Sequence, residues 1–165
     1  MRKQRNIPLI IASVLCAVSL VTMIATLAFT QKDKEPPTFV PPSFEEQAIQ
    51  GVPEVPPDLG WSELDAKVYK VSVCGVVTVT DGKADVWFTN PESNTVWLKL
   101  RVLDGDGNIL GETGLIRPGE YVRSVSFYTI PEPGDAIGLK LMAYEPETYY
   151  SAGSATLNTV VAGGT

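Results

Sequence analysis

The sequence predicts an all-β domain, a seven-stranded antiparallel β-sandwich of the immunoglobulin-like kind, after one N-terminal transmembrane helix and a Pro-rich linker. Three observations predict it: an uncharged apolar run near the N-terminus, a group of prolines after it, and period-two alternation of apolar residues beyond residue 67. The predicted parts are a cytoplasmic tip (1–6), a transmembrane helix (7–29), an extended linker (30–66) and an extracytoplasmic β-domain (67–165).

The apolar run begins at Ile7, ends at Phe29 and contains 23 residues without a charge. A hydrocarbon core of ~30 Å needs about 20 helical residues, whereas the apolar core of a cleavable signal peptide has about 7–15. The nearest cleavage-like sequence ends in Thr30, a poor final residue, and Leu15 stands where a lipoprotein signal would need a small residue before Cys16. We therefore expect an uncleaved signal-anchor, with a cleaved signal as the alternative.

The charges around the run predict its orientation. Three basic residues and no acidic residue precede it, whereas lysines alternate with acidic residues just after it. Because basic flanks stay on the cytoplasmic side, the N-terminus is expected inside and the rest of the chain outside. The predicted location is the cell membrane, crossed once.

Composition narrows the function of the exported part. Beyond residue 30 it holds 19 acidic and 10 basic residues, a net charge of −9, which argues against nucleic acid as a partner. The chain has no histidine, so Ser–His and Cys–His catalysis are excluded. The two cysteines, Cys16 and Cys74, fall on opposite sides of the linker, and we expect Cys74 to be a buried thiol. We expect no enzymatic activity, no cofactor and no metal site.

The segment 30–66 contains seven prolines, which favour an extended chain. Phe39, Val40 and Phe44 are more apolar than a spacer requires, and Trp61 is expected to pin the end of the linker onto the domain. Beyond it, apolar residues alternate with polar ones, and turn sequences such as Asp81-Gly82 separate the alternating stretches. The alternating positions are Val71, Val73, Val77 and Val79; Ala84, Val86 and Phe88; Leu98, Leu100 and Val102; and Ile137, Leu139, Leu141 and Ala143.

Turn and strand sequences in the second half of the chain carry a resemblance. They are Asn90-Pro91, Leu100-Arg101-Val102-Leu103-Asp104, Gly107-Asn108-Ile109-Leu110, Gly114-Leu115-Ile116-Arg117-Pro118-Gly119 and Leu141-Met142-Ala143-Tyr144. The stretch resembles small single-pass surface proteins of Gram-positive bacteria with an immunoglobulin-like or fibronectin-III-like ectodomain. The resemblance covers about a third of the chain and implies a fold and a location, but no catalytic residues.

One turn has the beginning of a calcium loop. Asp104, Asp106 and Asn108 stand at positions 1, 3 and 5, but Ile109 replaces the required glycine and Leu115 replaces the bidentate glutamate. A hairpin turn accounts for the same residues. We interpret the run as a turn, and adventitious calcium binding stays open.

Trp87 and Trp97 form the candidate interaction surface. Both lie opposite in phase to the aliphatic positions of their strands, and pairing of these strands through the 90–95 loop would place the two rings on one face. Thr89, Lys99 and Arg101 would share that face. The competing interpretation is that Trp61 or another linker aromatic covers the rings, or that they stabilise the sheet.

Two functions are therefore predicted. The first is a membrane-anchored, non-enzymatic interaction or structural domain of the cell envelope with a protein partner. The alternative is a cell-wall carbohydrate-binding module that uses Trp87 and Trp97, with a glycan as the ligand.

Overall fold

The computed structural model describes residues 7–30 and 39–163 of the chain. It divides into two compact units, Met1–Val40 and Pro41–Thr165. The predicted cytoplasmic tip (1–6) and residues 31–38 of the predicted linker lie outside the described residues.

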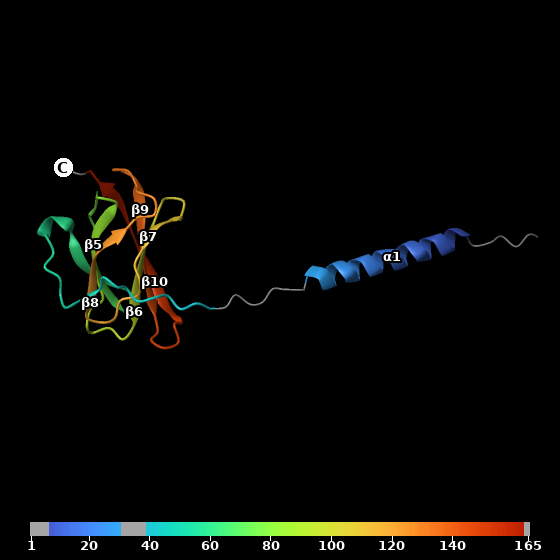
Figure 1. Ribbon diagram of the computed structural model, residues 1–165, viewed down its shortest axis with the longest axis horizontal. Helices are drawn as coiled ribbons and strands as arrows, with labels where there is room; N and C mark the ends of the chain where they lie inside the picture. Colours follow the sequence, from blue (N-terminus) through green and yellow to red (C-terminus); the bar gives the residue numbers. More distant parts are fainter. Residues whose placement is uncertain (1–6, 31–38, 164–165) are drawn as a thin grey trace, which may run out of the picture. The chain divides into compact units, whose positions relative to one another are not determined.

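The first unit contains one helix, α1 (Ile7–Thr30, 24 residues; Figure 1). It extends one residue beyond the predicted segment 7–29. The hydroxyls of Ser19 and Thr22 donate to backbone carbonyls of the preceding turn, Ser19 to Cys16 at 2.9 Å and Thr22 to Ser19 at 2.9 Å. The side chains described in α1 are those of residues 12–26. Over these side chains and the rest of the described chain, no helix is both long enough and apolar enough to cross a membrane.

The second unit is an all-β domain with one 3-10 turn, η1 (Pro57–Leu59). Among the residues that the structure describes, it has ten strands (Figure 1). They are β1 (Ile49–Gln50), β2 (Trp61–Asp65), β3 (Lys70–Cys74), β4 (Val77–Thr80), β5 (Lys83–Thr89), β6 (Trp97–Leu103), β7 (Ile109–Glu112), β8 (Glu120–Ser126), β9 (Ala136–Tyr144) and β10 (Ser151–Ala162).

These strands form one curled, mixed sheet. Its order is β1-β8-β5-β4-β10-β9-β6-β7, and β3 joins β2 to β5 beside this path. The pairs are antiparallel except β4 and β10, which are parallel and meet only at Val161↔Val77 and Ala162↔Thr78. A single bridge between Gly111 and Phe127 also links β7, the last strand of this order, to the residue that follows β8. The sheet therefore has two arms, β8-β5-β3-β2 and β7-β6-β9-β10, connected at both sides.

The core lies between the two arms. Alternate residues of β5, β6 and β9 point into it, which confirms the predicted apolar positions on these strands. The side chains that are at most 3% exposed include Ala84, Val86, Phe88, Leu98, Leu100, Val102, Ile137, Leu139, Leu141 and Ala143. Burying a large apolar side chain contributes ~1.5–3 kcal/mol, so this alternation is the main source of stability.

The segment 30–66 differs from the predicted linker. From Pro41 onward it belongs to the compact domain and contributes β1 and β2, which is one reason why ten strands replace the expected seven. The backbone of Leu115 donates to Ser43, and that of Glu45 donates to Leu115, both at 2.9 Å. Prolines can flank strands at the edge of a sheet, where a missing N–H leaves no ladder bond unmade. Between them, Phe44 and Leu59 provide apolar contacts.

Candidate functional site

The five residues of the predicted surface lie on two strands that do not pair. Trp87 and Thr89 are in β5, which pairs with β3, β4 and β8, whereas β6 pairs with β7 and β9. The predicted pairing of β5 with β6 is therefore wrong, and the two tryptophans lie in different arms of the sheet. The paired-tryptophan platform on which the carbohydrate-binding alternative depended does not form.

Asn90 explains why the 90–95 loop connects the arms instead of forming a hairpin. Its side chain is fully buried, and its amide donates to the carbonyls of Val96 at 2.9 Å and Ile116 at 3.1 Å. Its side-chain oxygen accepts a bond from Asn94 at 2.7 Å. These hydrogen bonds fix the loop in a conformation that crosses the end of the core from one arm to the other.

Trp87 occupies a β-bulge. The register with β8 passes from Asp85↔Ser124 to Phe88↔Val122, so two residues of β5 oppose one of β8, and Trp87 has a φ of 44°. Its ring stacks on Tyr121 with centroids 6.1 Å apart. Its carbonyl accepts bonds from the Trp61 indole and the Thr89 hydroxyl, both at 3.0 Å. Within the described residues, the buried indole N–H of Trp87 has no hydrogen-bond partner.

Trp97 is contacted by other aromatic residues on the outer face of β6. Phe44 meets its ring edge-on at a centroid distance of 4.8 Å, and Tyr149 does so at 5.2 Å. The Arg117 guanidinium lies 3.7 Å from the centroid of the Phe44 ring. Phe44 is thus a linker aromatic that covers one side of Trp97, as the competing interpretation proposed. Trp61 instead anchors the carbonyl of Trp87.

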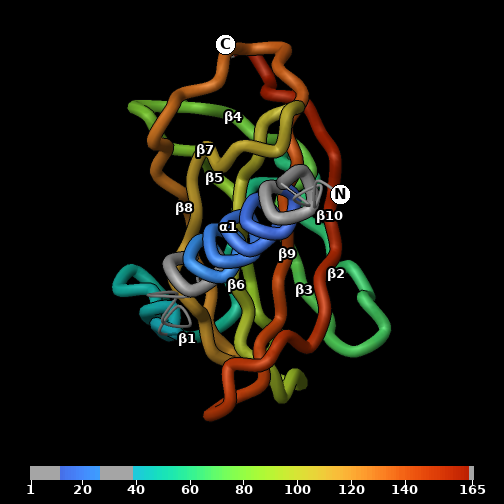
Figure 2. The backbone as a smooth tube through the Cα atoms, turned by 90° about the vertical axis from the view of Figure 1, so that its right-hand side faces the viewer, coloured from blue at the N-terminus to red at the C-terminus, as the bar shows by residue number. Residues whose placement is uncertain are grey.

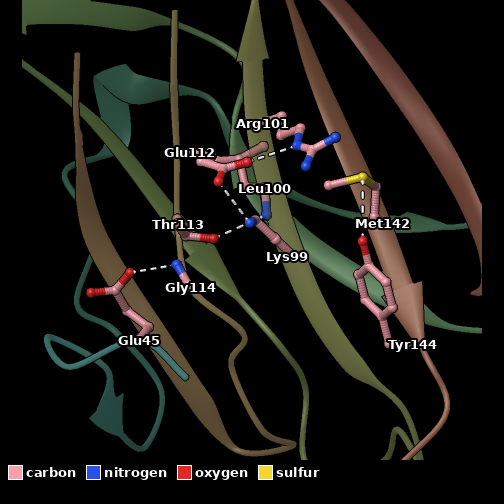
Figure 3. A network of polar contacts seen from close by, with 9 residues as sticks. All are labelled: Glu45, Lys99, Leu100, Arg101, Glu112, Thr113, Gly114, Met142 and Tyr144. Atoms are coloured by element: carbon pink, nitrogen blue, oxygen red, sulfur yellow. Dashed lines mark hydrogen bonds and ion pairs between the residues drawn. The ribbon is translucent and has the colours of Figure 1, made fainter. Parts of the chain in front are cut away.

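Lys99 and Arg101, the remaining two predicted residues, converge on one carboxylate (Figure 3). The Glu112 carboxylate accepts from Lys99 Nζ at 2.9 Å and from Arg101 Nε at 2.7 Å. The Lys99 side chain is only 9% exposed, and that of Glu112 is 24% exposed. Burial raises the pKa of Glu112, but the hydrogen bonds and charges of the two cations outweigh it, so that the pKa lies below its ordinary value.

A third cation, Lys140, lies beside this group. It is the cross-strand partner of Arg101 in β9, and Arg101 is the partner of Glu112 in β7. Like charges opposite each other destabilise a sheet, and Lys140 forms no salt bridge with any described residue. We call Lys99, Arg101, Lys140 and Glu112 the basic face.

The surroundings of the basic face combine aromatic and hydroxyl groups. Tyr144 is opposite Trp97 in the register and donates its hydroxyl to the Met142 sulfur at 3.8 Å (Figure 3). Thr156 of β10 is opposite Lys140 and is exposed. The basic face therefore has three positive charges and one negative charge, and it lies beside aromatic and hydroxyl side chains.

The calcium-like turn is satisfied by its own residues. Asp104 Oδ1 accepts from the backbone N–H groups of Asp106 at 2.9 Å and Asn108 at 2.8 Å, and its Oδ2 accepts from the Asn108 side chain at 2.8 Å. The side-chain bond from Asn108 is the main cause that lowers the pKa of Asp104. In the described ranges, no three Asp, Glu or Cys side chains are grouped so that they could hold a metal ion.

Sequence reasoning missed Lys140, Glu112 and Tyr144. Their place depends on the register of β6 with β7 and β9, and the sequence offers no local signal of that register. No protein-family model matches the chain, and a search of curated proteins finds no match.

Proposed function

We propose that this chain is a membrane-anchored, non-enzymatic interaction domain of the cell envelope, and that the basic face binds an acidic segment of a protein partner. The observation that carries the proposal is the ion-paired group of Lys99, Arg101 and Glu112, with Lys140 as the cross-strand neighbour of Arg101, on a strongly acidic domain. Residues 41–165 contain eight basic and 17 acidic residues, a net charge of −9. Three of the eight basic residues are gathered on the basic face, so an acidic ligand would meet favourable charge there.

The anchor in this proposal is α1. A 24-residue helix is about 36 Å long at 1.5 Å per residue, enough for a ~30 Å hydrocarbon core. Each of its Ser19, Thr22 and Thr26 hydroxyls donates to a carbonyl of the preceding turn, which leaves fewer unpaired polar groups to bury in lipid. The basic N-terminal flank supports a cytoplasmic N-terminus and an extracytoplasmic domain.

We further infer that the domain is a variant of the immunoglobulin-like sandwich. The support is its two antiparallel arms around one core, and the strand β4, which pairs antiparallel with β5 and makes a parallel contact with β10. The fold class implies no activity by itself.

Formaldehyde cross-linking in cells that express the tagged full chain would test the basic face, because this reagent joins several kinds of side chain in contact and replacing one lysine does not by itself remove the cross-link. The test variant is Lys140→Glu, which removes the excess charge and gives Arg101 an acidic cross-strand neighbour. The control is Lys83→Glu, an exposed position in β5 with the same change in net charge. We expect a protein partner to be cross-linked by the wild type and by the control, but not by Lys140→Glu.

Two results would reject the proposal. If Lys140→Glu retains the partner, the basic face does not bind it. If no protein is cross-linked to the wild-type chain in membranes, the interaction function itself loses its support.

A further inference from the structure

β10 is the longest strand of the domain and presents an unpaired edge. It contains 12 residues without a charged residue or a proline. It pairs with β9, which runs beside it, from Ser151 to Val160 (Figure 2). Its other edge meets β4 only at Val161 and Ala162. Among the described residues, no strand pairs with the second edge of β10 over 151–160, although the Thr159 hydroxyl donates to the carbonyl of Gly75 at 2.7 Å.

The direction of the backbone groups follows from the ladder. Val161 exchanges backbone hydrogen bonds on the β9 side, accepting from Gly134 at 2.8 Å and donating to Asp135 at 2.9 Å. Residues of an antiparallel strand alternate between the two edges, and the register with β9 shows no shift between residues 153 and 160. The N–H and C=O groups of Ser154, Thr156 and Asn158 therefore point away from β9, toward the unpaired edge.

Other edge strands of the domain carry features that discourage further pairing. β2 has two acidic residues, and Glu63 forms a salt bridge with Lys70 at 2.8 Å. β1 has only two residues. β10 has no charged residue and no proline, and it is not short, so it has none of these usual features that keep an edge strand from pairing. Its only irregularity is the bulge near Gly153.

We propose that the free edge of β10 pairs antiparallel with β10 of a second copy of this chain. Two domains of net charge −9 repel each other, and a strand without charge is where their backbones can meet at the lowest electrostatic cost. Antiparallel pairing of a strand with itself is isologous, so it closes as a twofold dimer and does not propagate.

The register that uses most of the unpaired length is centred on Thr156. It places Thr156 opposite its own copy, and Ser154 opposite Asn158 of the other copy. All three side chains are exposed, and hydroxyl and amide groups paired across strands stabilise a sheet. The dimer adjoins the basic face, because Thr156 is the cross-strand partner of Lys140, and it adds a self-association function to the proposed one.

Cysteine cross-linking of the full chain in membranes tests this inference. In a background of Cys16→Ala and Cys74→Ala, the test variant is Thr156→Cys, and the matched control is Ser62→Cys, an exposed serine in the edge strand β2. Under mild oxidation we expect a covalent dimer of Thr156→Cys only. Adding Asn158→Lys should reduce this dimer to the level of the control, because a lysine at the edge opposes pairing, whereas adding Ser62→Lys should leave it unchanged.

Three outcomes would overturn the inference. Thr156→Cys could stay monomeric, or both cysteine variants could cross-link equally, which would indicate random collision. Thr156→Cys could instead form a disulfide with a different protein, which would replace the second copy as the occupant of the edge. Resistance to protease in the lysine variants would establish that any loss of dimer is not caused by unfolding.

Discussion

Trp61 in β2 donates its indole N–H to the backbone carbonyl oxygen of Trp87 in β5, across 3.0 Å. The same carbonyl accepts the hydroxyl of Thr89 at 3.0 Å. The bulge at Trp87 removes this residue from the regular ladder with β8, so side chains supply its partners. Trp61, which was expected to fix the linker, therefore also stabilises a β-bulge of the sheet.

This relationship predicts a non-additive pair of substitutions. Trp61→Phe and Thr89→Val should each lower the free energy of unfolding by about 1 kcal/mol, because each removes one of two donors. The double variant should lose more than the sum, because the part-buried carbonyl is then left without a partner. Urea unfolding of residues 41–165, followed by far-ultraviolet circular dichroism, measures the three values. Strict additivity would show that the two bonds do not share a role.

The sequence predicted what depends on local pattern. The apolar alternation of β5, β6 and β9 identified buried side chains such as Phe88, Leu100 and Leu139 correctly. It could not show which strands pair, because pairing depends on contacts between distant residues. The buried side chain of Asn90, whose amide bonds two distant carbonyls, looks like an ordinary loop residue in the sequence.

The candidate site shows the same limit. Lys99 and Arg101 were predicted to share a face with Trp97, and all three lie in β6 in alternate positions. Trp87 did not join them, because the prediction assumed that consecutive strands form a hairpin. The sequence did not predict that residues 41–66 belong to the folded domain. Their proline content indicates an extended chain but does not show whether that chain packs against the sheet.

The N-terminal segment of the domain passes so close to Gly114 that a side chain does not fit there. A Cβ at Gly114 would lie 2.5 Å from the Glu45 backbone nitrogen, and the Gly114 N–H donates to the Glu45 carboxylate at 2.7 Å. Gly114→Ala should therefore displace residues 43–45 and destabilise the domain by about 1–3 kcal/mol. Limited proteolysis should then cut this segment first.

Gly105→Ala is the matched control, because a Cβ there would meet nothing within 4 Å. We expect its stability to stay within about 0.5 kcal/mol of the wild type. Equal stability of the two variants would contradict the close packing of residues 43–45 against Gly114.

The basic face predicts a pH dependence of stability. The folded pKa of Glu112 lies below its ordinary value, so the carboxylate stabilises the fold above the unfolded pKa of about 4.3, and this contribution is lost as the pH falls through the folded pKa. Glu112→Gln should cost about 2 kcal/mol at pH 7, because it leaves the nearly buried Lys99 without an anionic partner. The difference between wild type and variant should shrink below about pH 4.

Urea unfolding at a series of pH values from 3 to 8 would measure this difference. Glu147→Gln, at an exposed position in the β9–β10 connection, controls for loss of a carboxylate. A difference that stays constant below pH 4 would show that the ionised form of Glu112 does not stabilise the fold.

The thiol of Cys74 provides a probe of how the core opens. The side chain is fully buried, and burial raises the pKa of the thiol to about 12. Because the thiolate is the reactive form, we expect a maleimide to leave Cys74 unmodified in the folded full-length Cys16→Ala variant and to modify it rapidly in urea. Adding Ser62→Cys places an exposed thiol in the neighbouring strand β2, and this thiol should react at once in both conditions. If Cys74 reacted as fast as the thiol at position 62 without denaturant, the strand β3 would open readily, and the packing of β3 against the core could not be a stable part of the fold.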